Sequence, residues 1–328
     1  MTKVLVVGSW GRLVHWTEST VEAFKQAGCD VDYFATNGRN SADALYMKLR
    51  RKLSGDDQAY VAEGLRRKIK KTQPDLIVFV LGAWLSELPF QAAIEASPQS
   101  VKVAWVGDLF DEVQCVFAKH MDWIFCTDTY FIELLGAYDH SAPTSYLPLA
   151  MDPQRFFPTD IPRSNKVVYV ARNSPSRAEL ISKIQLPLML YGKQWRKSMA
   201  KFNNSPHEIS LHHLPISQLP QVYASCRAVL NIKNEIRVAR GINMRSFEPY
   251  GCMTPVLNDD VADLGLCFEL GSEILVYQNL EQLHEWHAKL TSDAPFAQKI
   301  GLAGHKRVIA HHTYVHRAQA ILKQVGLK

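Results

Sequence analysis

Short apolar segments that do not alternate with polar residues recur along the chain, and stretches of helical periodicity separate them. In the first half they lie at 4–7, 31–34, 75–81, 101–106, 123–126 and 145–147, and a helical pattern covers 17–26. A strand that is apolar throughout is buried on both faces, as in a parallel sheet that helices cover on both sides. The pattern therefore predicts an α/β fold, because strands that alternate with helices pair in parallel.

A proline-rich segment interrupts this alternation and predicts a joint between two domains. Residues 148–163 contain four prolines and show no periodicity. After it, apolar segments resume at 166–171, 188–191, 209–211, 228–232, 255–257 and 274–277. A chain of 328 residues has room for two domains of ordinary size. We predict two Rossmann-like domains facing a cleft, at 1–155 and 156–305, with ligands beyond the carboxyl ends of the strands.

The composition narrows the classes of function. The formal net charge of +5 suits an anionic ligand but is too small to indicate nucleic acid as a partner. The six cysteines form no C-x-x-C pair, so we expect a reduced, cytoplasmic setting. No apolar run is long enough to span a membrane. The apolar start of the chain ends in Gly8-Ser9, which favours a first strand over a signal peptide.

The segment 231–260 contains the most informative pair of charged residues. Arg245 and Glu248 are three residues apart in a pattern that predicts a helix, so they would share one face of it. A nucleotide sugar needs both kinds of charge, a cation for its diphosphate and a carboxylate for its ribose hydroxyls. The alternatives are an ion pair between the two residues, which is compatible with that role, and, for Glu248, a plain surface carboxylate.

A phosphate site is predicted where the first strand of the second domain ends. Asn173 and Ser174 follow that strand and open a helix, whose free N–H groups and dipole favour an anion. Arg177 would add a bidentate charge, and Lys193 is a further candidate for the phosphate. For both basic residues the alternative is a solvated side chain.

The loop after the first strand, Gly8-Ser9-Trp10-Gly11, bears on the cofactor and on catalysis. It is not the G-x-G-x-x-G of dinucleotide-binding proteins, so NAD is not predicted. By position the loop borders the cleft, which makes Gly11 a candidate donor contact and His15 a candidate base. Asp108, after the strand 101–106, is the other candidate base for an acceptor hydroxyl. Its alternative role is to cap the next helix.

The sequence predicts no metal site. Asp30 and Asp32 form a D-x-D, but they alternate with apolar residues along a predicted strand, which is the pattern of a half-exposed strand. The adjacent histidines at 212–213 and 311–312 have no further ligands at a useful spacing.

Several segments, in a common order, resemble those of a known family. They are VAWVGDLFDE, MDWIFCTDTYFIELL, YLPLAMDPQRFFP, YVARNSPSRAELI, LMLYGKQW and RSFEPYGCMTPVLND. The chain resembles a glycosyltransferase of the GT-B architecture, closest to the CgeB-like (spore maturation protein-like) group. The resemblance implies metal-independent transfer of a sugar from a nucleotide-diphosphate sugar, UDP or dTDP, to a glycan, lipid-linked or protein acceptor, without a cofactor. It also implies that a C-terminal helix, 306–328, packs back on the first domain.

The same resemblance assigns roles to individual residues. Glu248 would hold the ribose and Arg245 would face the diphosphate. The loop LHHLP would line the base pocket through His213 and Leu214. Retaining GT-B enzymes carry a first glutamate eight residues before the second, where this chain has Arg240. We include Arg240 among the donor-binding candidates, and the departure leaves the stereochemistry of transfer open.

Two other classes of function remain open on the sequence alone. A non-catalytic nucleotide-sugar-binding protein on the same fold is one, and the glutamate-to-arginine departure keeps it open. A two-domain NAD-dependent oxidoreductase is the other, and the missing G-x-G-x-x-G counts against it.

A basic region extends from Lys48 to Lys71 and includes LRRKL and GLRRKIKK. Basic amphipathic helices lie on anionic lipid, so this region predicts a peripheral contact with a membrane. The alternative is a solvated helix face.

Overall fold

The computed structural model describes residues 1–11, 15–38, 41–54, 57–82, 84–201, 206–210, 214–233 and 239–327. Contacts between residues divide the chain into two compact units. Within the described ranges, unit 1 holds residues 1–148, 239–241 and 314–327, and unit 2 holds 149–233 and 242–313.

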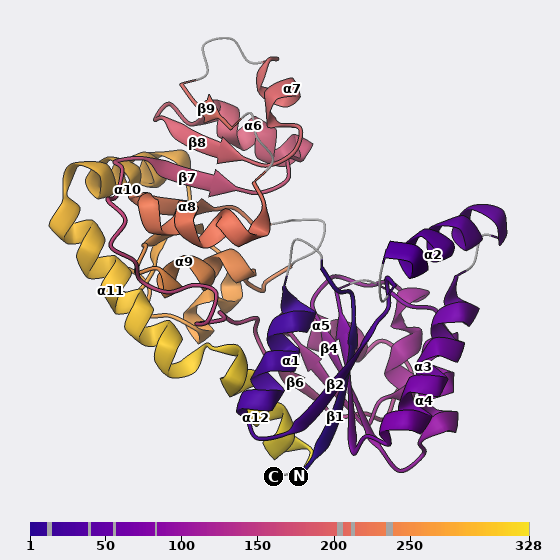
Figure 1. Ribbon diagram of the computed structural model, residues 1–328. Helices are drawn as coiled ribbons and strands as arrows, with labels where there is room; N and C mark the ends of the chain where they lie inside the picture. Colours follow the sequence, from indigo (N-terminus) through magenta and orange to yellow (C-terminus); the bar gives the residue numbers. More distant parts are fainter. Residues whose placement is uncertain are drawn as a thin grey trace. The chain divides into compact units, whose positions relative to one another are not determined.

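Unit 1 is built on a parallel sheet of six strands in the order β2-β1-β3-β4-β5-β6 (Figure 1). The strands are β1 (Lys3–Gly8), β2 (Asp30–Ala35), β3 (Leu76–Leu81), β4 (Val101–Val106), β5 (Trp123–Cys126) and β6 (Thr144–Tyr146). The helices are α1 (Trp16–Gln26), α2 (Ser41–Ser54), α3 (Gln58–Thr72), α4 (Glu87–Ala96), η1 (Gln114–His120), α5 (Thr129–Leu135) and α12 (Tyr314–Gln324). Every residue of the inner strand β3 is buried, as its apolar sequence predicts.

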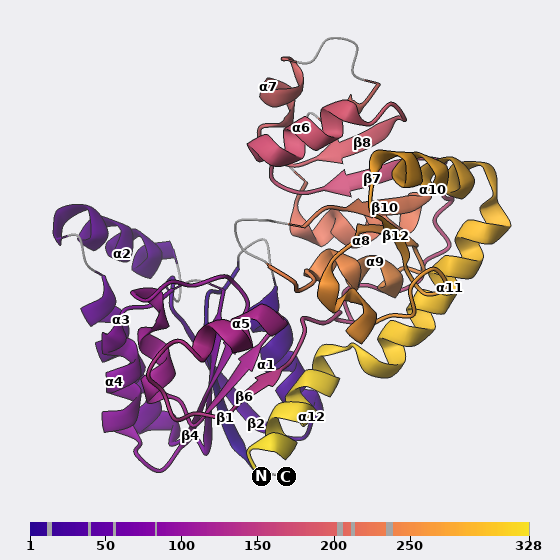
Figure 2. The ribbon, with the colours of Figure 1, turned by 180° about the vertical axis from the view of Figure 1, so that it is seen from behind.

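Helices cover both faces of this sheet. On one face, α3, α4 and α5 contribute Leu65, Phe90 and Phe131 to a core that includes Phe79 of β3. On the other face, α1 packs against α12, and both views show these helices side by side (Figures 1 and 2). Trp105 of β4 anchors them, since its ring centroid lies 5.0 Å from that of Trp16 in α1 and 6.1 Å from that of Tyr314 in α12.

Unit 2 repeats the plan with a parallel sheet in the order β12-β11-β10-β7-β8-β9. The strands are β7 (Val167–Val170), β8 (Leu188–Tyr191), β9 (Glu208–Ile209), β10 (Ala228–Asn231), β11 (Val256–Asp259) and β12 (Leu275–Tyr277). The helices are α6 (Pro175–Lys183), α7 (Trp195–Met199), η2 (Ile216–Gln218), α8 (Leu219–Ser225), η3 (Met244–Ser246), α9 (Glu248–Gly251), η4 (Ala262–Leu266), α10 (Leu280–Ser292) and α11 (Ala294–His311).

The predicted fold class is confirmed: both units are Rossmann-like, with parallel sheets between helices. Each predicted strand has a counterpart, and 101–106, 123–126 and 188–191 have the predicted bounds. By these contacts the chain first leaves unit 1 after Pro148 and last returns to it after Thr313. The sequence predicts these boundaries at 155 and 305.

One helical prediction is wrong in detail. Arg245 and Glu248 do not share one helix, because η3 ends at Ser246 and α9 begins at Glu248. A continuous helix would need an N–H from residue 249 to the carbonyl of residue 245, and Pro249 has none. At the end of the chain, α11 and α12 are separated at His312, whose carbonyl accepts a hydrogen bond from the Met151 N–H at 2.9 Å.

Among the described residues, no helix combines the length and the apolar character needed to cross a membrane. All six cysteines are free thiols. Within the same part of the chain, no group of three or more histidine, cysteine or acidic side chains is arranged to hold a metal ion.

Gly301 of α11 allows this helix to approach the turn that follows α9. A Cβ atom there would lie 2.3 Å from the carbonyl oxygen of Met253, and the main chain gives way less easily than a side chain. We expect Gly301→Ala to lower the Tm by about 2–4 °C for each kcal/mol of unfolding free energy that is lost. This loss is expected although alanine has about 1 kcal/mol more helix propensity than glycine. A thermal melt of the full chain measures this. Gly265→Ala is the control, because nothing lies within 4 Å of a Cβ there; an equal Tm for both variants would contradict the prediction.

Candidate functional site

The carboxyl edge of the unit 2 sheet brings together most of the predicted donor residues. The chain passes from β7 through β8 and β9 on one side and then crosses to β10 on the other side of β7. The strand order therefore reverses between β7 and β10, and ligands of such sheets bind beyond the carboxyl ends of the strands at this point.

Arg245 bridges the ends of these two strands. Its Nε donates to Oδ1 of Asn231, the last residue of β10, at 3.0 Å, and its Nη1 donates to the carbonyl of Val170, the last residue of β7, at 3.3 Å. Its main-chain N–H is capped by the Asn243 side chain at 2.9 Å. The guanidinium is half-buried, and its Nη2 makes no hydrogen bond in the described part of the chain. One end of the cation is thus fixed and the other is available to a ligand.

A buried network of amides and a hydroxyl fixes the Asn231 side chain. Its Nδ2 donates to Ser246 Oγ at 3.0 Å and to Asn258 Oδ1 at 2.7 Å, and these three side chains are at most 1% exposed. Its Oδ1 accepts from Asn243 at 3.1 Å as well as from Arg245. Since both ends of the amide are used, the oxygen that holds Arg245 cannot turn away without leaving buried polar atoms unpaired.

Glu248 begins α9 and is half-buried. Burial raises the pKa of its carboxyl to about 7, with Arg245 and Arg155 acting against the rise and Asp152 adding to it. The predicted ion pair with Arg245 is absent among the described residues, and in that part of the chain the carboxylate accepts no hydrogen bond. A carboxylate in such surroundings is costly unless it is paired, so hydroxyl donors from a ligand would stabilise it.

The predicted phosphate residues at α6 behave differently from one another. Ser174 caps the helix, because its Oγ accepts the N–H of Arg177 at 3.4 Å. The Asn173 amide donates to Ser198 Oγ. The guanidinium of Arg177 is only 7% exposed and donates to the carbonyls of Arg172 at 3.3 Å and Ile232 at 3.0 Å. Arg177 therefore braces the edge from inside, contrary to both the phosphate-facing and the solvated alternatives.

Lys193 is exposed at the end of β8 and has no ion pair in the described residues. It follows Gly192, whose φ of +137° and close approach to Ala171 require glycine, since a Cβ would lie 2.0 Å from the Ala171 carbonyl oxygen. Leu214 is half-buried, and His213 lies outside the described residues.

Arg240 belongs to unit 1, whereas Arg245 belongs to unit 2. Its guanidinium pairs with Glu133 and lies 5.5 Å from the ring centroid of Tyr130. Its main-chain N–H donates to Oδ2 of the buried Asp128 at 2.9 Å. The departure from the glutamate of retaining enzymes thus corresponds to an arginine that is engaged with its own unit.

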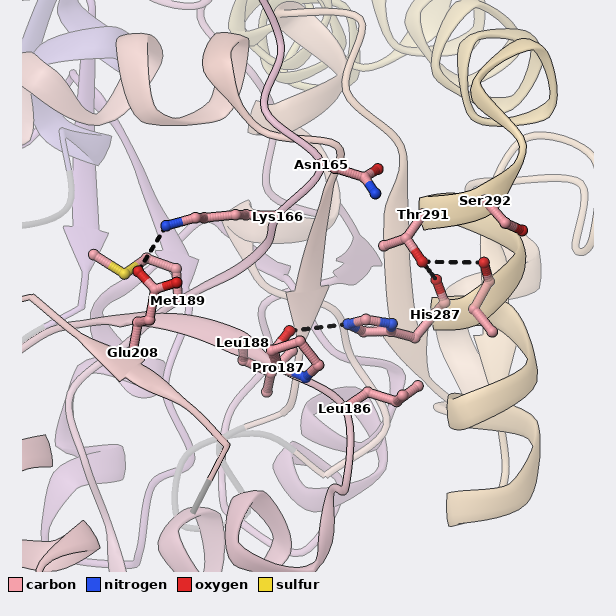
Figure 3. Close-up of a pocket in the computed structure, with 11 residues that line it drawn as sticks. Asn165, Lys166, Leu186, Pro187, Leu188, Met189, Glu208, His287, Thr291 and Ser292 are labelled. Atoms are coloured by element: carbon pink, nitrogen blue, oxygen red, sulfur yellow. Dashed lines mark hydrogen bonds and ion pairs between the residues drawn. The ribbon is translucent and has the colours of Figure 1, made fainter. Parts of the chain in front are cut away.

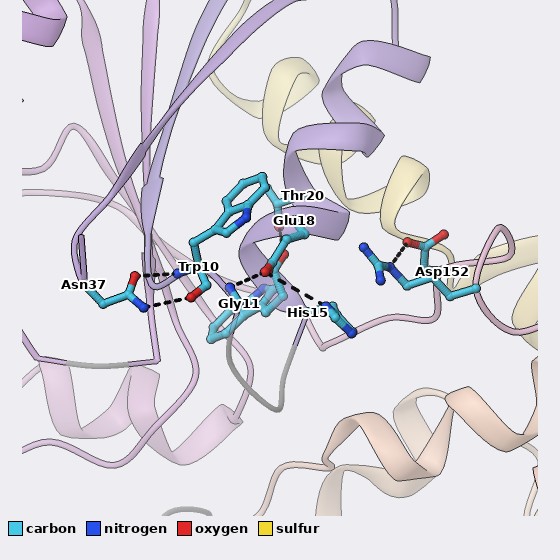
Figure 4. A network of polar contacts seen from close by, with 9 residues as sticks. Trp10, Gly11, His15, Glu18, Thr20, Asn37 and Asp152 are labelled. Carbon is cyan, nitrogen blue, oxygen red and sulfur yellow. Dashed lines mark hydrogen bonds and ion pairs between the residues drawn. The ribbon is translucent and has the colours of Figure 1, made fainter. Parts of the chain in front are cut away.

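In unit 1 a polar cluster surrounds the start of α1 (Figure 4). The carboxylate of Glu18, 9% exposed, accepts the N–H of Gly11, and its Oε1 lies 4.0 Å from Nδ1 of His15. Burial works to raise the pKa of Glu18, but His15 and the Gly11 N–H outweigh it and lower the pKa. The loop itself is closed by Asn37, which exchanges hydrogen bonds of 2.8 and 2.7 Å with the main chain of Trp10.

Three buried polar atoms of this cluster have no hydrogen-bond partner among the described residues: His15 Nδ1, Trp16 Nε1 and Glu18 Oε2. Buried polar atoms are rarely left unpaired, so their grouping at one helix start is suited to a hydroxyl-bearing ligand. The sequence prediction includes His15 and Gly11 but not Glu18. A glutamate in the first turn of a helix, three residues after a histidine, is the signal that would have found it.

Asp108, the other predicted base, is half-buried after β4 and Gly107. Its predicted alternative role is wrong, because the next helix, η1, has Val113 at its cap position. Asp111 accepts the N–H of Gln114 there, at 2.9 Å.

A separate hollow of about 560 Å³ lies by the amino ends of β7 and β8, beside α10 (Figure 3). Its lining is Asn165, Lys166, Leu186, Pro187, Leu188, Met189, Glu208, His287, Ala288, Thr291 and Ser292. None of the predicted site residues is among them. Its ionisable groups are engaged already, since Lys166 pairs with Glu208 at 2.6 Å and His287 Nε2 contacts the Pro187 carbonyl at 3.1 Å.

The chain is similar to a known family over one segment and to solved structures over its whole length. Residues 173–323 match the model of a family described as glycosyl transferase-like. The chain thus carries a glycosyl transferase-like segment. No curated protein matches the chain.

Solved structures similar to the whole chain have the GT-B fold. Sucrose-phosphate synthase from Thermosynechococcus elongatus has 14% identity and a TM-score of 0.71, with 99% of each chain covered. HepE from Anabaena, in complex with UDP, has 13% identity and a TM-score of 0.68, with 99% of this chain and 100% of that chain covered. An alpha-glucosyltransferase in complex with UDP-glucose and DNA containing an abasic site has 10% identity and a TM-score of 0.66, with 99% of each chain covered. At these identities the likeness establishes the fold and not the reaction.

The raised pKa of Glu248 makes a testable contribution to stability. The folded-state pKa of about 7 lies above the ordinary value of 4.5, so the folded chain binds this proton more tightly than the unfolded chain. The contribution is complete below the ordinary pKa and is lost as the pH rises through 7. We expect the Tm of Glu248→Gln, relative to the unsubstituted protein, to be higher near pH 8 than near pH 5.

The control for this measurement is Glu285→Gln, which alters an exposed glutamate of α10 without an ion pair in the described residues. Its Tm difference from the unsubstituted protein should not change with pH. A pH-independent difference for Glu248→Gln would contradict the prediction.

Proposed function

We propose that the protein transfers a sugar from a nucleotide-diphosphate sugar, with UDP or dTDP as the nucleotide, to a hydroxyl of a glycan, lipid-linked or protein acceptor. One observation carries the proposal. Glu248, whose carboxylate accepts no hydrogen bond from the described residues, lies in the field of Arg245, whose Nη2 is unused in the same part of the chain, at the point where the strand order reverses. The family match over residues 173–323 supports the same class of reaction.

The two side chains suit the two ends of a nucleoside diphosphate. The Glu248 carboxylate accepts hydrogen bonds from the ribose hydroxyls, which supply the donors that it lacks among the described residues. Arg245 donates through Nη2 to the diphosphate, and the exposed Lys193 adds charge at the same edge. A nucleoside diphosphate leaves with developing negative charge, so cations fixed at this position lower the barrier without a metal ion.

The bond changes follow from that arrangement. The bond between the sugar C1 and the diphosphate oxygen breaks, and its electron pair leaves with the nucleoside diphosphate. The acceptor oxygen forms the new bond to C1 and loses its proton to a base. We assign that proton to His15, because the Glu18 carboxylate beside it stabilises the imidazolium that forms. Asp108 stays the second candidate.

The nucleotide, the location and the subfamily are further details of the proposal. UDP is favoured because HepE is bound to UDP and UDP-glucose in its structures and the alpha-glucosyltransferase is bound to UDP-glucose. The six free thiols support a cytoplasmic location. The CgeB-like assignment stays a prediction from the sequence segments alone.

The role of Arg245 can be separated from that of the base pocket by comparing two ligands. We expect Arg245→Gln to weaken UDP binding by about 10- to 150-fold, the value of a hydrogen bond to a charged group, and to leave uridine binding unchanged. Isothermal titration calorimetry measures both affinities. The matched control is Arg196→Gln, which removes the same charge from an exposed position on α7.

Glu248→Ala should weaken UDP and uridine alike, and it should abolish the preference for uridine over 2′,3′-dideoxyuridine. If Arg245→Gln weakened uridine as much as UDP, or Glu248→Ala kept the preference for the ribose hydroxyls, the donor site as proposed would be wrong.

Catalysis by the unit 1 cluster is tested by release of UDP from UDP-glucose and UDP-N-acetylglucosamine. We expect His15→Gln and Glu18→Gln to slow release by about 10²–10⁴-fold while UDP affinity is unchanged, because a general base contributes about that much. Glu22→Gln, on the surface of the same helix, is the control. If Asp108→Asn released UDP slowly and His15→Gln released it at the normal rate, Asp108 would be the base. If the unsubstituted protein bound UDP but released none from any UDP-sugar, the non-catalytic alternative would be favoured.

A further inference from the structure

The helix α2 turns a row of leucines outward. Leu45, Leu49 and Leu53 are 59%, 48% and 84% exposed. They are four residues apart, so they lie within about 80° of one another around the helix axis. We call these three side chains the leucine stripe. Single exposed leucines are common on protein surfaces, but three on one face of one helix form a continuous apolar strip.

The stripe is exposed because the opposite side of α2 holds the helix to unit 1. Met47 is 5% exposed and belongs to the core of that unit. Tyr60 of α3 donates a hydrogen bond to Asp43, which lies on the same side of α2 as Met47, at 3.2 Å. In both views α2 lies at the margin of unit 1, at the end of α3 (Figures 1 and 2). One side of α2 is therefore packed against unit 1, and its apolar face stays exposed.

The charge of α2 indicates what covers that face. Its sequence, SADALYMKLRRKLS, carries four basic residues and one acidic residue. The exposed Lys52 stands directly before Leu53 at the end of the stripe. An apolar face beside an excess of basic residues is typical of helices that lie in the interface of an anionic membrane.

The rest of the predicted basic region, in α3, is partly paired within the protein. Arg66 pairs with Glu63 at 2.8 Å and with Glu95 at 2.7 Å, and Lys68 pairs with Asp32 at 2.5 Å. Lys70 and Lys71, at the end of the helix, are exposed. Of the two helices, only α2 also exposes a row of leucines.

We propose that α2 is a docking surface for a membrane containing anionic phospholipid, with the leucine stripe in the boundary between headgroups and acyl chains and the exposed Lys52 beside the phosphates. A second copy of this chain is the other occupant to consider. Pairing of two such helices would bring two sets of like charges together, which opposes it, whereas a lipid phosphate neutralises them. The proposal goes beyond the sugar-transfer function, and it would place the acceptor at a membrane surface.

The test is co-sedimentation of the full chain with vesicles of phosphatidylcholine alone and with vesicles of phosphatidylcholine and phosphatidylglycerol in equal parts. We expect binding to the second kind only, weakened by salt. The variant Leu45→Ser/Leu49→Ser/Leu53→Ser should bind about a hundredfold less tightly, because it removes the apolar contact. Lys48→Glu/Lys52→Glu should bind about thirtyfold less tightly and depend less on salt.

The matched control is Val113→Ser/Leu266→Ser/Leu270→Ser, which alters three apolar residues that are 80%, 57% and 49% exposed elsewhere. It should bind vesicles like the unsubstituted protein. The proposal is overturned if the unsubstituted protein ignores anionic vesicles, or if the stripe variant and this control bind alike. It is also overturned if sedimentation velocity shows a dimer that the stripe variant converts to a monomer, because the stripe would then join two copies.

UDP affinity of each variant, measured in the absence of vesicles, shows that unit 2 has folded and keeps the two proposals apart. Vesicle binding without any UDP or dTDP binding would leave the docking surface standing and remove the sugar-transfer function. UDP binding without vesicle binding would do the reverse.

Discussion

The hydrogen bonds of one side-chain amide, that of Asn231, hold together the edge of unit 2 on which the candidate site stands. Its nitrogen joins η3 and β11 through Ser246 and Asn258, and its oxygen fixes the Arg245 guanidinium. Breaking any of these bonds would strand a buried polar group at a cost of about 1–3 kcal/mol. The network therefore fixes β10, β11 and η3 in one arrangement, whereas apolar contacts alone would let these elements slide past one another.

Two arginines at this edge show how a fold divides its cations between structure and ligand. Arg177 reaches across from α6 and ends on two main-chain carbonyls inside the protein. Arg245 uses only Nε and Nη1 for the protein and keeps Nη2 free in the described chain. Both follow strands of the same sheet, but under the proposed function only the second binds an anion from outside. The distinction depends on what each guanidinium touches.

The contacts of these two arginines mark the limit of what could be predicted from the sequence. The strands were predictable because each is a short run of apolar residues, a property of the segment itself. The direction of the Arg177 side chain depends on the carbonyl of Ile232, a distant residue, so no local pattern contains it. The break between Arg245 and Glu248 was readable in principle, since Pro249 cannot donate to residue 245. The amide network was not, because an asparagine at the end of a strand more often signals a turn.

The burial of Glu248 has a consequence for how a nucleotide would be sensed. With a pKa of about 7, the carboxyl group is divided between its neutral and ionised forms near neutral pH. A ribose hydroxyl that donates to it favours the ionised form alone, so under the proposed function each binding event expels part of a proton into solution. Occupancy of the site then becomes coupled to the acidity around the protein, and a drop in pH would empty it without any change in nucleotide concentration.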